Sequence, residues 1–305
     1  MLRAKMRAKS FHVSLLICAV MGVGVANATP KNPVLDLTIP APVQPITDPA
    51  LFDETVLMAP NFAISQEDPA LSELFSPTGA SNLCVPTAIA QDLIFLSTYA
   101  KPSMNQLILS GMAPDRKSID PNALIRQLAS LCKTDAINGT TGYSAIDCVS
   151  TILKQSGYGL GNTTEIFPGF VPDSTRPVQA RMVTLKDIRD TLKSGVPALL
   201  DVGWYKYDST TQSWTYTGGH LIGVYGYDYS NAWGENMIQI KMINPDLDYG
   251  TGRGIHYDTV TIERYSPQPG VKYPANRPFI FSGTSFGGTV TRGFLNGLTR
   301  IAPSL

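Results

Sequence analysis

The residue in this sequence best suited to nucleophilic chemistry is Cys84. It lies in the segment N-L-C-V-P at 82–86, just before an apolar stretch, residues 86–99, whose spacing predicts a buried helix with Pro86 in its first turn. A thiol at a helix N-terminus is next to the positive end of the helix dipole and to backbone N–H groups, which stabilise the thiolate and lower the pKa of the thiol. Cys84 is therefore the candidate nucleophile; the alternatives are a buried, inert cysteine or one partner of a different disulfide.

Activation of a thiol requires a base, and two histidines follow Cys84 in the chain. His220 opens an apolar run, so its side chain can face a cleft at the start of a strand, although a lone histidine there is often structural. His256 lies in a glycine-rich turn and is interpreted as structural. A strand predicted just before Asn244 ends in Asn244-Pro245-Asp246. If that strand lies beside the strand of His220, Asn244 or Asp246 can accept the ring N–H and orient the imidazole.

The elements that must position these residues are of two kinds, which the sequence pattern distinguishes. Helical spacing and start and stop signals predict helices in the first part of the chain, at 86–99, 120–132, 144–155 and 184–193. Apolar runs between turn signals predict strands later, at 196–204, 220–227, 237–243 and 257–265. The glycine- and threonine-rich C-terminal tail gives no clear pattern. A helical first half and a strand-rich second half predict an α+β fold of two lobes, with the active site between them.

The N-terminus has the pattern of a secretory signal peptide. Residues 1–9 hold four basic and no acidic side chains, an apolar run follows at 11–25, and Ala26-Asn27-Ala28 suits cleavage after Ala28. The apolar run is too short to cross a bilayer. We therefore predict export, to the periplasm or outside the cell, with no membrane attachment after cleavage. Residues 29–70 are proline-rich and non-periodic and are interpreted as a lead-in or strap, which leaves 71–305 as the main domain.

Cysteine usage agrees with an oxidising compartment. Cleavage after residue 28 removes Cys18 and leaves Cys84, Cys132 and Cys148. Cys132 and Cys148 lie near the ends of neighbouring predicted helices, and a bond between them closes a loop of about 15 residues, which contributes on the order of 3 kcal/mol. That pairing leaves Cys84 as the odd thiol.

Charge and composition exclude several classes of function. Without residues 1–28 the chain holds 20 basic and 24 acidic residues, so it lacks the basic surface of a nucleic-acid-binding protein. The histidines and cysteines lack zinc-site spacing, and no nucleotide-binding loop occurs in a strand-to-helix context. We therefore predict no metal and no cofactor. An aromatic group around a predicted turn at 209–213 is interpreted as hairpin packing, with a substrate pocket as the alternative; it comprises Trp204, Tyr205, Tyr207, Trp214 and Tyr216.

Three segments together resemble the motifs of papain-like cysteine peptidases, in particular the bacterial branch similar to bacteriocin-leader-processing peptidases. They are N-L-C-V-P-T-A at 82–88, G-G-H-L-I-G-V-Y-G-Y-D at 218–228 and I-N-P-D at 243–246. Cys84 and His220 are 136 positions apart, within the roughly 130–150 of papain-like chains. The resemblance spans about residues 70–265 and implies a papain-like two-lobe fold, with a helical N-terminal lobe and an antiparallel β-rich C-terminal lobe.

The resemblance also implies roles for single residues. Cys84 is then the nucleophile, His220 the base and later the acid, and Asn244 the orienting residue, with Asp246 as its substitute. The glutamine that helps to stabilise the oxyanion in this family, about six residues before the cysteine, is replaced here by Thr78, and the nearest upstream glutamine is Gln66. Asn82 is the candidate donor in its place. The tryptophan that often follows the family's asparagine is also absent.

The leading hypothesis from the sequence is thus an exported, monomeric cysteine peptidase or related amide hydrolase that acts on a peptide or protein substrate. The missing glutamine motivates a second hypothesis, a catalytically inactive scaffold of the same family that serves as a secreted binding or effector protein. A third keeps the cysteine and histidine but changes the substrate, as in a cell-wall amidase or a transglutaminase-like acyltransferase. Those families usually place the cysteine and histidine closer in sequence, so this hypothesis ranks lower.

Overall fold

The helices form close to where the sequence predicts them. The structure, a computed structural model, describes residues 32, 35–36, 53–56, 63–100, 102–114, 117–170, 176–246, 258–283, 286 and 290–305. The α-helices in these ranges are α1 (Cys84–Phe95), α2 (Pro121–Leu131), α3 (Gly142–Gln155) and α4 (Leu185–Lys193). Asp120 caps α2, and Thr184 and Asp187 form a capping box at α4. Short helical segments are η1 (Pro69–Leu74), η2 (Leu96–Ala100), η3 (Pro102–Gly111) and η4 (Asn231–Asn236).

The strands form one large sheet and a small two-stranded one. The small sheet pairs β1 (Leu35–Asp36) with β3 (Ser118–Ile119). The large sheet contains β2 (Asp53–Val56), β4 (Thr164–Ile166), β5 (Val178–Gln179), β6 (Ala198–Asp208), β7 (Ser213–Tyr229), β8 (Met237–Ile243), β9 (Asp258–Arg264), β10 (Phe279–Ser282) and β11 (Thr291–Arg300). The strands β6 to β9 overlap the four predicted ones, and the predicted turn joins β6 to β7.

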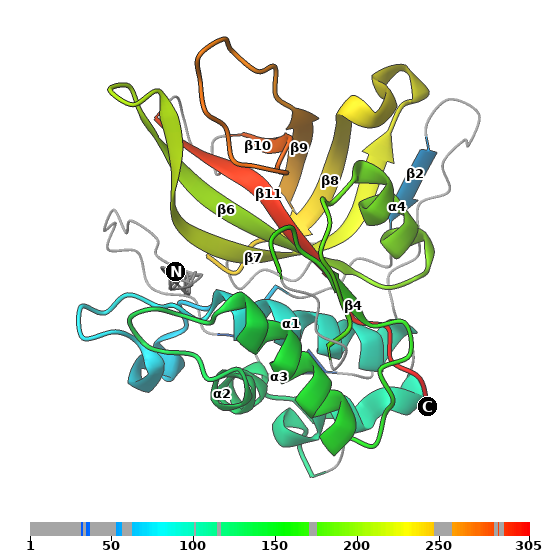
Figure 1. Cartoon of the computed structure of the whole chain (residues 1–305). Coiled ribbons are helices and arrows are strands. Elements are labelled where there is room, and N and C mark those ends of the chain that lie inside the picture. The colour runs from blue at the N-terminus through cyan, green and yellow to red at the C-terminus, as the bar shows by residue number, and fades with distance from the viewer. Residues whose placement is uncertain are drawn as a thin grey trace, which may run out of the picture.

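Six of these strands close into an antiparallel barrel. They pair in the order β10-β9-β8-β7-β6-β11, and β10 also pairs with β11 through Ile280 and Phe294. This last pairing joins the two ends of the sheet. Beyond the ring, β4 pairs with β11, β5 with β4, and β2 with β7. Figure 1 shows the barrel with α1, α2 and α3 together on one side of it.

The two-lobe papain-like fold predicted from the sequence is therefore wrong. The chain folds as a closed six-stranded barrel with a few helices packed against it. The error has a physical source in the C-terminal tail, which gave no clear sequence pattern. That tail supplies β10 and β11, and without them the remaining strands would form an open sheet rather than a ring.

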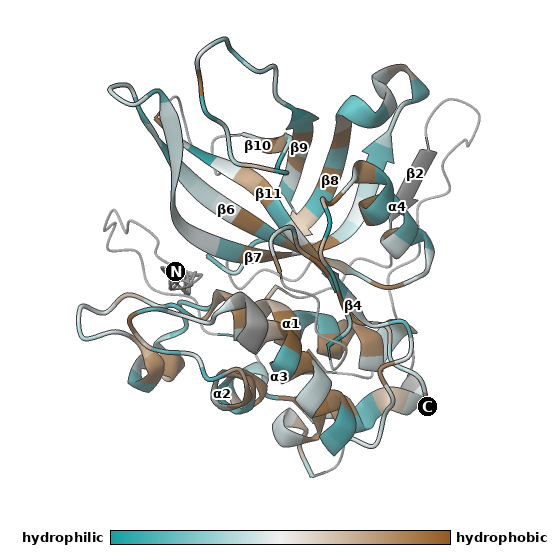
Figure 2. Cartoon of the chain, in the orientation of Figure 1, coloured by the Kyte–Doolittle hydropathy of each residue, from teal (hydrophilic) through white to brown (hydrophobic). Residues whose placement is uncertain are grey.

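The barrel interior and the space around α1 form two of the apolar cores, and Phe95 of α1 belongs to the core in the barrel. Alternate residues of β6 to β9 point into the barrel, among them Leu200, Val202 and Ile240. Every residue of α1 is buried, including its polar ones. A helix buried on all sides must be covered all round, and α1 packs against β7 on one side and α2 on another. Figure 2 shows the apolar residues concentrated on α1 and alternating along the strands.

The predicted disulfide is confirmed. Cys132, at the end of α2, is bonded to Cys148 on α3, with Cα atoms 4.6 Å apart, so the bond ties together two helices that pack against each other. Both cysteines are fully buried in the same core as α1. No helix within the described ranges is long and apolar enough to cross a membrane.

Parts of the proline-rich segment 29–70 pack onto the main domain. The strand β2 pairs with the end of β7, and Asn32 is buried. The Asn32 side chain donates to the Ser65 carbonyl (2.9 Å) and to Asn122 Oδ1 (2.7 Å) at the start of α2. The predicted signal peptide, residues 1–28, lies outside the described residues, and the predicted boundaries at 28 and 70 stay predictions.

Candidate functional site

The structure brings His220 and Asn244 into direct contact. His220 lies on β7, Asn244 directly follows β8, and these two strands pair with Ile243 opposite Gly223. The distance from His220 Nε2 to Asn244 Oδ1 is 2.6 Å, and both side chains are buried. The juxtaposition that the sequence predicted from two neighbouring strands is therefore present.

The hydrogen bonds of Asn244 determine which ring nitrogen of His220 carries the proton. The backbone N–H of Asp246 donates to Asn244 Oδ1 at 3.0 Å, so this atom is an acceptor. Nε2 of His220 must then donate to it, which leaves Nδ1 as the basic nitrogen of the neutral ring. Nδ1 is buried and has no hydrogen-bond partner among the described residues. The arrangement thus presents one proton-accepting atom that the surrounding fold does not use.

Asp246 is a second neighbour of the imidazole, and it is acidic. Its Oδ2 lies 3.5 Å from His220 Nε2, further than Asn244 Oδ1. Burial raises the pKa of the Asp246 carboxyl, and the charge of His220 opposes that rise. The sequence left Asn244 and Asp246 open as the third residue of the site. The distances make Asn244 the direct hydrogen-bond partner and Asp246 a charge beside it.

Cys84 is the first residue of α1, two positions earlier than the sequence predicted. Leu83 precedes the helix and provides no side-chain cap, so the backbone N–H groups of the first turn are not covered by a capping side chain. The Cys84 side chain is fully buried. It belongs to the same apolar core as Leu221, the neighbour of His220 on β7.

A chain of hydrogen bonds ties the segment before Cys84 to the turn that holds Asn244 and Asp246. Ser81 Oγ donates to the Gln66 carbonyl at 2.8 Å, and the Gln66 N–H donates to the Pro245 carbonyl at 3.0 Å. The loop that leads into Cys84 and the turn that orients His220 are therefore held together through one residue, Gln66.

Gln66 is a residue of the site that the sequence reasoning set aside. Its side chain is fully buried, its Nε2 donates to Asp246 Oδ1, and its Oε1 has no partner among the described residues. The neighbouring Glu67 lies close enough that burial first, and then the charge of Asp246, raises the pKa of its carboxyl. The only sequence signal was that Gln66 is the nearest glutamine before Cys84. Because the two residues are 18 positions apart, nothing in the sequence indicated that Gln66 contacts Ser81 and Asp246.

Asn82, the predicted oxyanion donor, has other partners. Its Nδ2 donates to the carbonyls of Ala136 (2.7 Å) and Ile137 (3.1 Å) in the loop between α2 and α3. An amide nitrogen has two hydrogens, so an oxyanion role would require Asn82 to release one of these carbonyls. That role stays a prediction.

The expectation of an odd thiol at Cys84 applies to the chain without residues 1–28 and stays a prediction, whereas the structure is that of the full-length chain. Cys84 is disulfide-bonded, and its partner is neither Cys132 nor Cys148, which are bonded to each other. His256, the other candidate base, lies outside the described residues.

No protein-family model matches this chain, and no curated protein is significantly similar to it. The resemblance to papain-like peptidases therefore stays a prediction that rests on the three short segments.

Proposed function

We propose that this protein is a cysteine hydrolase that cleaves peptide or related amide bonds, with Cys84 as nucleophile and His220 as general base and acid. The observation that carries the proposal is the state of the His220 ring. Asn244 holds the proton on Nε2, and Nδ1 has no partner among the described residues. A buried imidazole nitrogen kept basic in this way is suited to take a proton from a nearby thiol.

The position of Cys84 supports its assignment as that thiol. It begins α1, where the helix dipole and the first-turn N–H groups stabilise a thiolate. The hydrogen bonds through Ser81 and Gln66 connect its loop to the turn that orients His220. Because Cys84 is disulfide-bonded in the full-length chain, the proposal requires that this bond be reduced or exchanged before the thiol acts.

In the proposed reaction His220 Nδ1 takes the proton of the Cys84 thiol, and the thiolate attacks the carbonyl carbon of the amide. The tetrahedral intermediate collapses as the imidazolium gives its proton to the leaving nitrogen, which breaks the C–N bond and leaves a thioester on Cys84. Water, with its proton taken by His220, then attacks the thioester, releases the acid and restores the thiol. Asn244, and more weakly Asp246, hold the imidazole and stabilise its charge throughout.

The first experiment measures the thiolate directly. The full-length chain is treated with a thiol reductant, and the ultraviolet absorbance of thiolate is recorded against pH for wild type, Cys84→Ala and His220→Ala. We expect a thiolate signal well below the roughly 8.5 pKa of an ordinary cysteine, absent in Cys84→Ala and shifted to higher pH in His220→Ala. Turnover of a peptide library should vanish in Cys84→Ala. A Cys84 thiol that titrates like an ordinary cysteine, indifferent to His220, would overturn the proposal.

The disulfide of Cys84 also favours one alternative, a binding protein that uses this barrel without catalysis. In a binding protein the bond at Cys84 is structural, and its reduction should lower stability without revealing any turnover. In a hydrolase, reduction should produce activity. The same assay run on peptidoglycan, and with added amine acceptors, separates peptidase activity from cell-wall amidase and acyl-transfer activity.

A further inference from the structure

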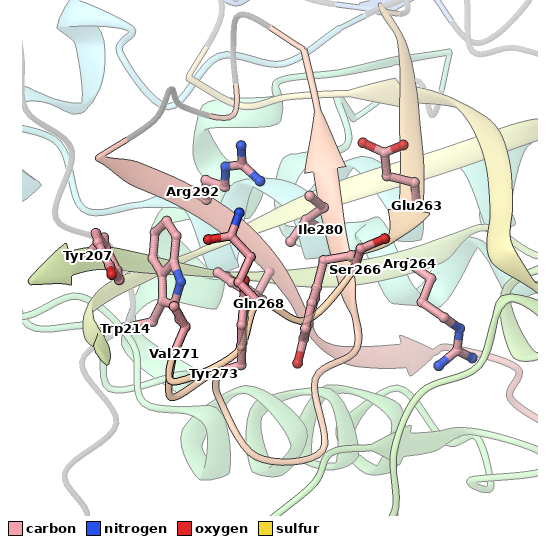
Figure 3. Close-up of a pocket in the computed structure, with 12 residues that line it drawn as sticks. Tyr207, Trp214, Glu263, Arg264, Ser266, Gln268, Val271, Tyr273, Ile280 and Arg292 are labelled. Carbon is pink, nitrogen blue, oxygen red and sulfur yellow. The ribbon is translucent and has the colours of Figure 1, made fainter. Parts of the chain in front are cut away.

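A pocket of about 400 Å³ lies on the outer face of the barrel, away from the residues of the proposed hydrolase. It is formed between the hairpin that joins β6 to β7 and the loop that follows β9. Figure 3 shows Tyr207 and Trp214 on one side of the pocket, Glu263 on the other and Ile280 between them. Its volume falls within the range of small-molecule sites.

Aromatic rings and backbone hydrogen bonds give the pocket a fixed shape. The Trp214 N–H donates to the Lys272 carbonyl at 3.0 Å, and the Lys272 N–H donates to the Gln212 carbonyl at 2.8 Å, so the hairpin and the loop are tied together. The Trp214 ring contacts the buried Phe294 ring edge-on at 5.6 Å. On the loop side, Tyr265 and Tyr273 stack at 4.2 Å. Because the pocket is rigid and preformed, little binding free energy is lost in ordering its side chains when a ligand binds.

The polar side chains at the rim offer both hydrogen-bond donors and acceptors. Arg292 supplies N–H donors, Glu263 supplies carboxylate oxygens, and Gln268 supplies both kinds of group. One oxygen of Glu263 accepts from Ser282 Oγ, and a carboxylate retains further acceptor capacity. Half-buried aromatic faces beside mixed donors and acceptors match a sugar ring, which has apolar C–H faces and hydroxyl groups at its edge.

We propose that this pocket binds a neutral saccharide unit, with Trp214 and Tyr207 against the ring and Arg292, Glu263 and Gln268 on its hydroxyl groups. A phosphate or another polyanion fits less well, because it needs donors alone and would be repelled by Glu263. Trp214 and His220 are six residues apart on β7, a distance of about 20 Å along the strand. The saccharide site is therefore separate from the proposed catalytic site and does not depend on it.

Calorimetric titration of the full chain tests this proposal. The probes are cellohexaose, maltohexaose and N-acetylchitohexaose, with ATP and an unrelated decapeptide as competitors. We expect one of the saccharides to bind saturably, with affinity lowered roughly tenfold or more in Trp214→Ala because a stacking ring is lost. Trp233→Ala, which removes a half-buried tryptophan in η4 outside the pocket, should leave the affinity unchanged.

A second variant keeps the test decisive if Trp214→Ala loosens the hairpin. Gln268 lies on the exposed loop, so Gln268→Ala should leave the thermal unfolding midpoint unchanged while weakening saccharide binding at least threefold; Gln239→Ala on β8 is the matched control. The proposal is overturned if none of the three saccharides binds, if both pocket variants bind as wild type does, or if ATP or the peptide occupies the pocket through these residues instead.

Discussion

Two buried carboxyl groups lie beside residues of β7, and they differ in what faces the carboxyl. Asp92, in the second half of α1, accepts one hydrogen bond from Tyr225 Oη at 2.8 Å and is fully buried. Asp246 faces the imidazole of His220 and the amide of Gln66 and keeps some exposure. Burial raises the pKa of both carboxyls, of Asp92 to about 8, but at Asp246 the charge of His220 opposes the rise.

This difference teaches that burial alone does not make a carboxyl functional. Tyr225 can only share its proton with Asp92, and burial together with Asp92 raises its own pKa well above the usual range, so the pair is neutral near pH 7 and serves packing. The rings of Phe95 and Tyr225, 5.4 Å apart, cover it. At the other site the partner is an imidazole, which donates through Nε2 and keeps Nδ1 as a proton acceptor with no partner among the described residues. Chemistry is therefore expected at His220 and not at Asp92.

The largest expected effect comes from removing the base. His220→Ala should lower kcat/KM for peptide hydrolysis by about 100- to 10,000-fold, the range for loss of a positioned general base. Tyr225→Phe, which removes the hydroxyl at the other site, should change kcat/KM by less than threefold. Both variants are measured in the same assay after reduction. Comparable losses of kcat/KM would mean that both substitutions lower activity by disturbing the fold, and that the two carboxyl sites do not differ in function.

The next effect concerns orientation of the ring. Asn244→Ala leaves the buried Nε2–H without its acceptor, which costs about 1–3 kcal/mol, or roughly 5- to 150-fold in kcat/KM. Asp246→Asn keeps the shape and removes only a charge 3.5 Å from Nε2, so its loss should be smaller, about tenfold at most. Steady-state kinetics on both variants ranks the two residues; a greater loss in Asp246→Asn would make Asp246 the orienting residue.

Much of this arrangement could be predicted from local pattern. The four helices and the strands β6 to β9 lie where periodicity and caps place them, and Asn244 reaches His220 because neighbouring strands bring their ends together. Closure of the barrel could not be predicted, because it depends on one long-range pairing, Ile280 with Phe294, in a glycine-rich tail. The role of Gln66 was hidden for the same reason. Its contact with Pro245 spans most of the domain and leaves no local signature.

The disulfide between α2 and α3 provides a test that should leave the difference between the two carboxyl sites intact. Replacing both Cys132 and Cys148 by alanine removes a loop constraint worth about 3 kcal/mol, and urea unfolding should show a loss near that size. At urea concentrations where the variant is folded, its kcat/KM should match that of wild type within about twofold. A large loss of activity in the folded variant would show that the bond holds α1, and with it Cys84, in position.

The smallest expected effect is the pH dependence of the unfolding free energy that comes from Asp92, the structural carboxyl. The pKa of Asp92 is about 8 in the folded chain and near 3.9 when unfolded, so between these values the folded form binds a proton that the unfolded form has released. Its contribution to stability is complete below pH 4 and falls as pH rises to 8, by at most about 1.4 kcal/mol per pH unit. Asp92→Asn keeps an acceptor for Tyr225. It should remove this part of the pH dependence of the unfolding free energy between pH 4 and 8. The exposed Asp190→Asn is the control and should leave the slope unchanged. A slope that survives in Asp92→Asn would mean that Asp92 is already ionised when folded, and the contrast with Asp246 would then lie in their partners alone.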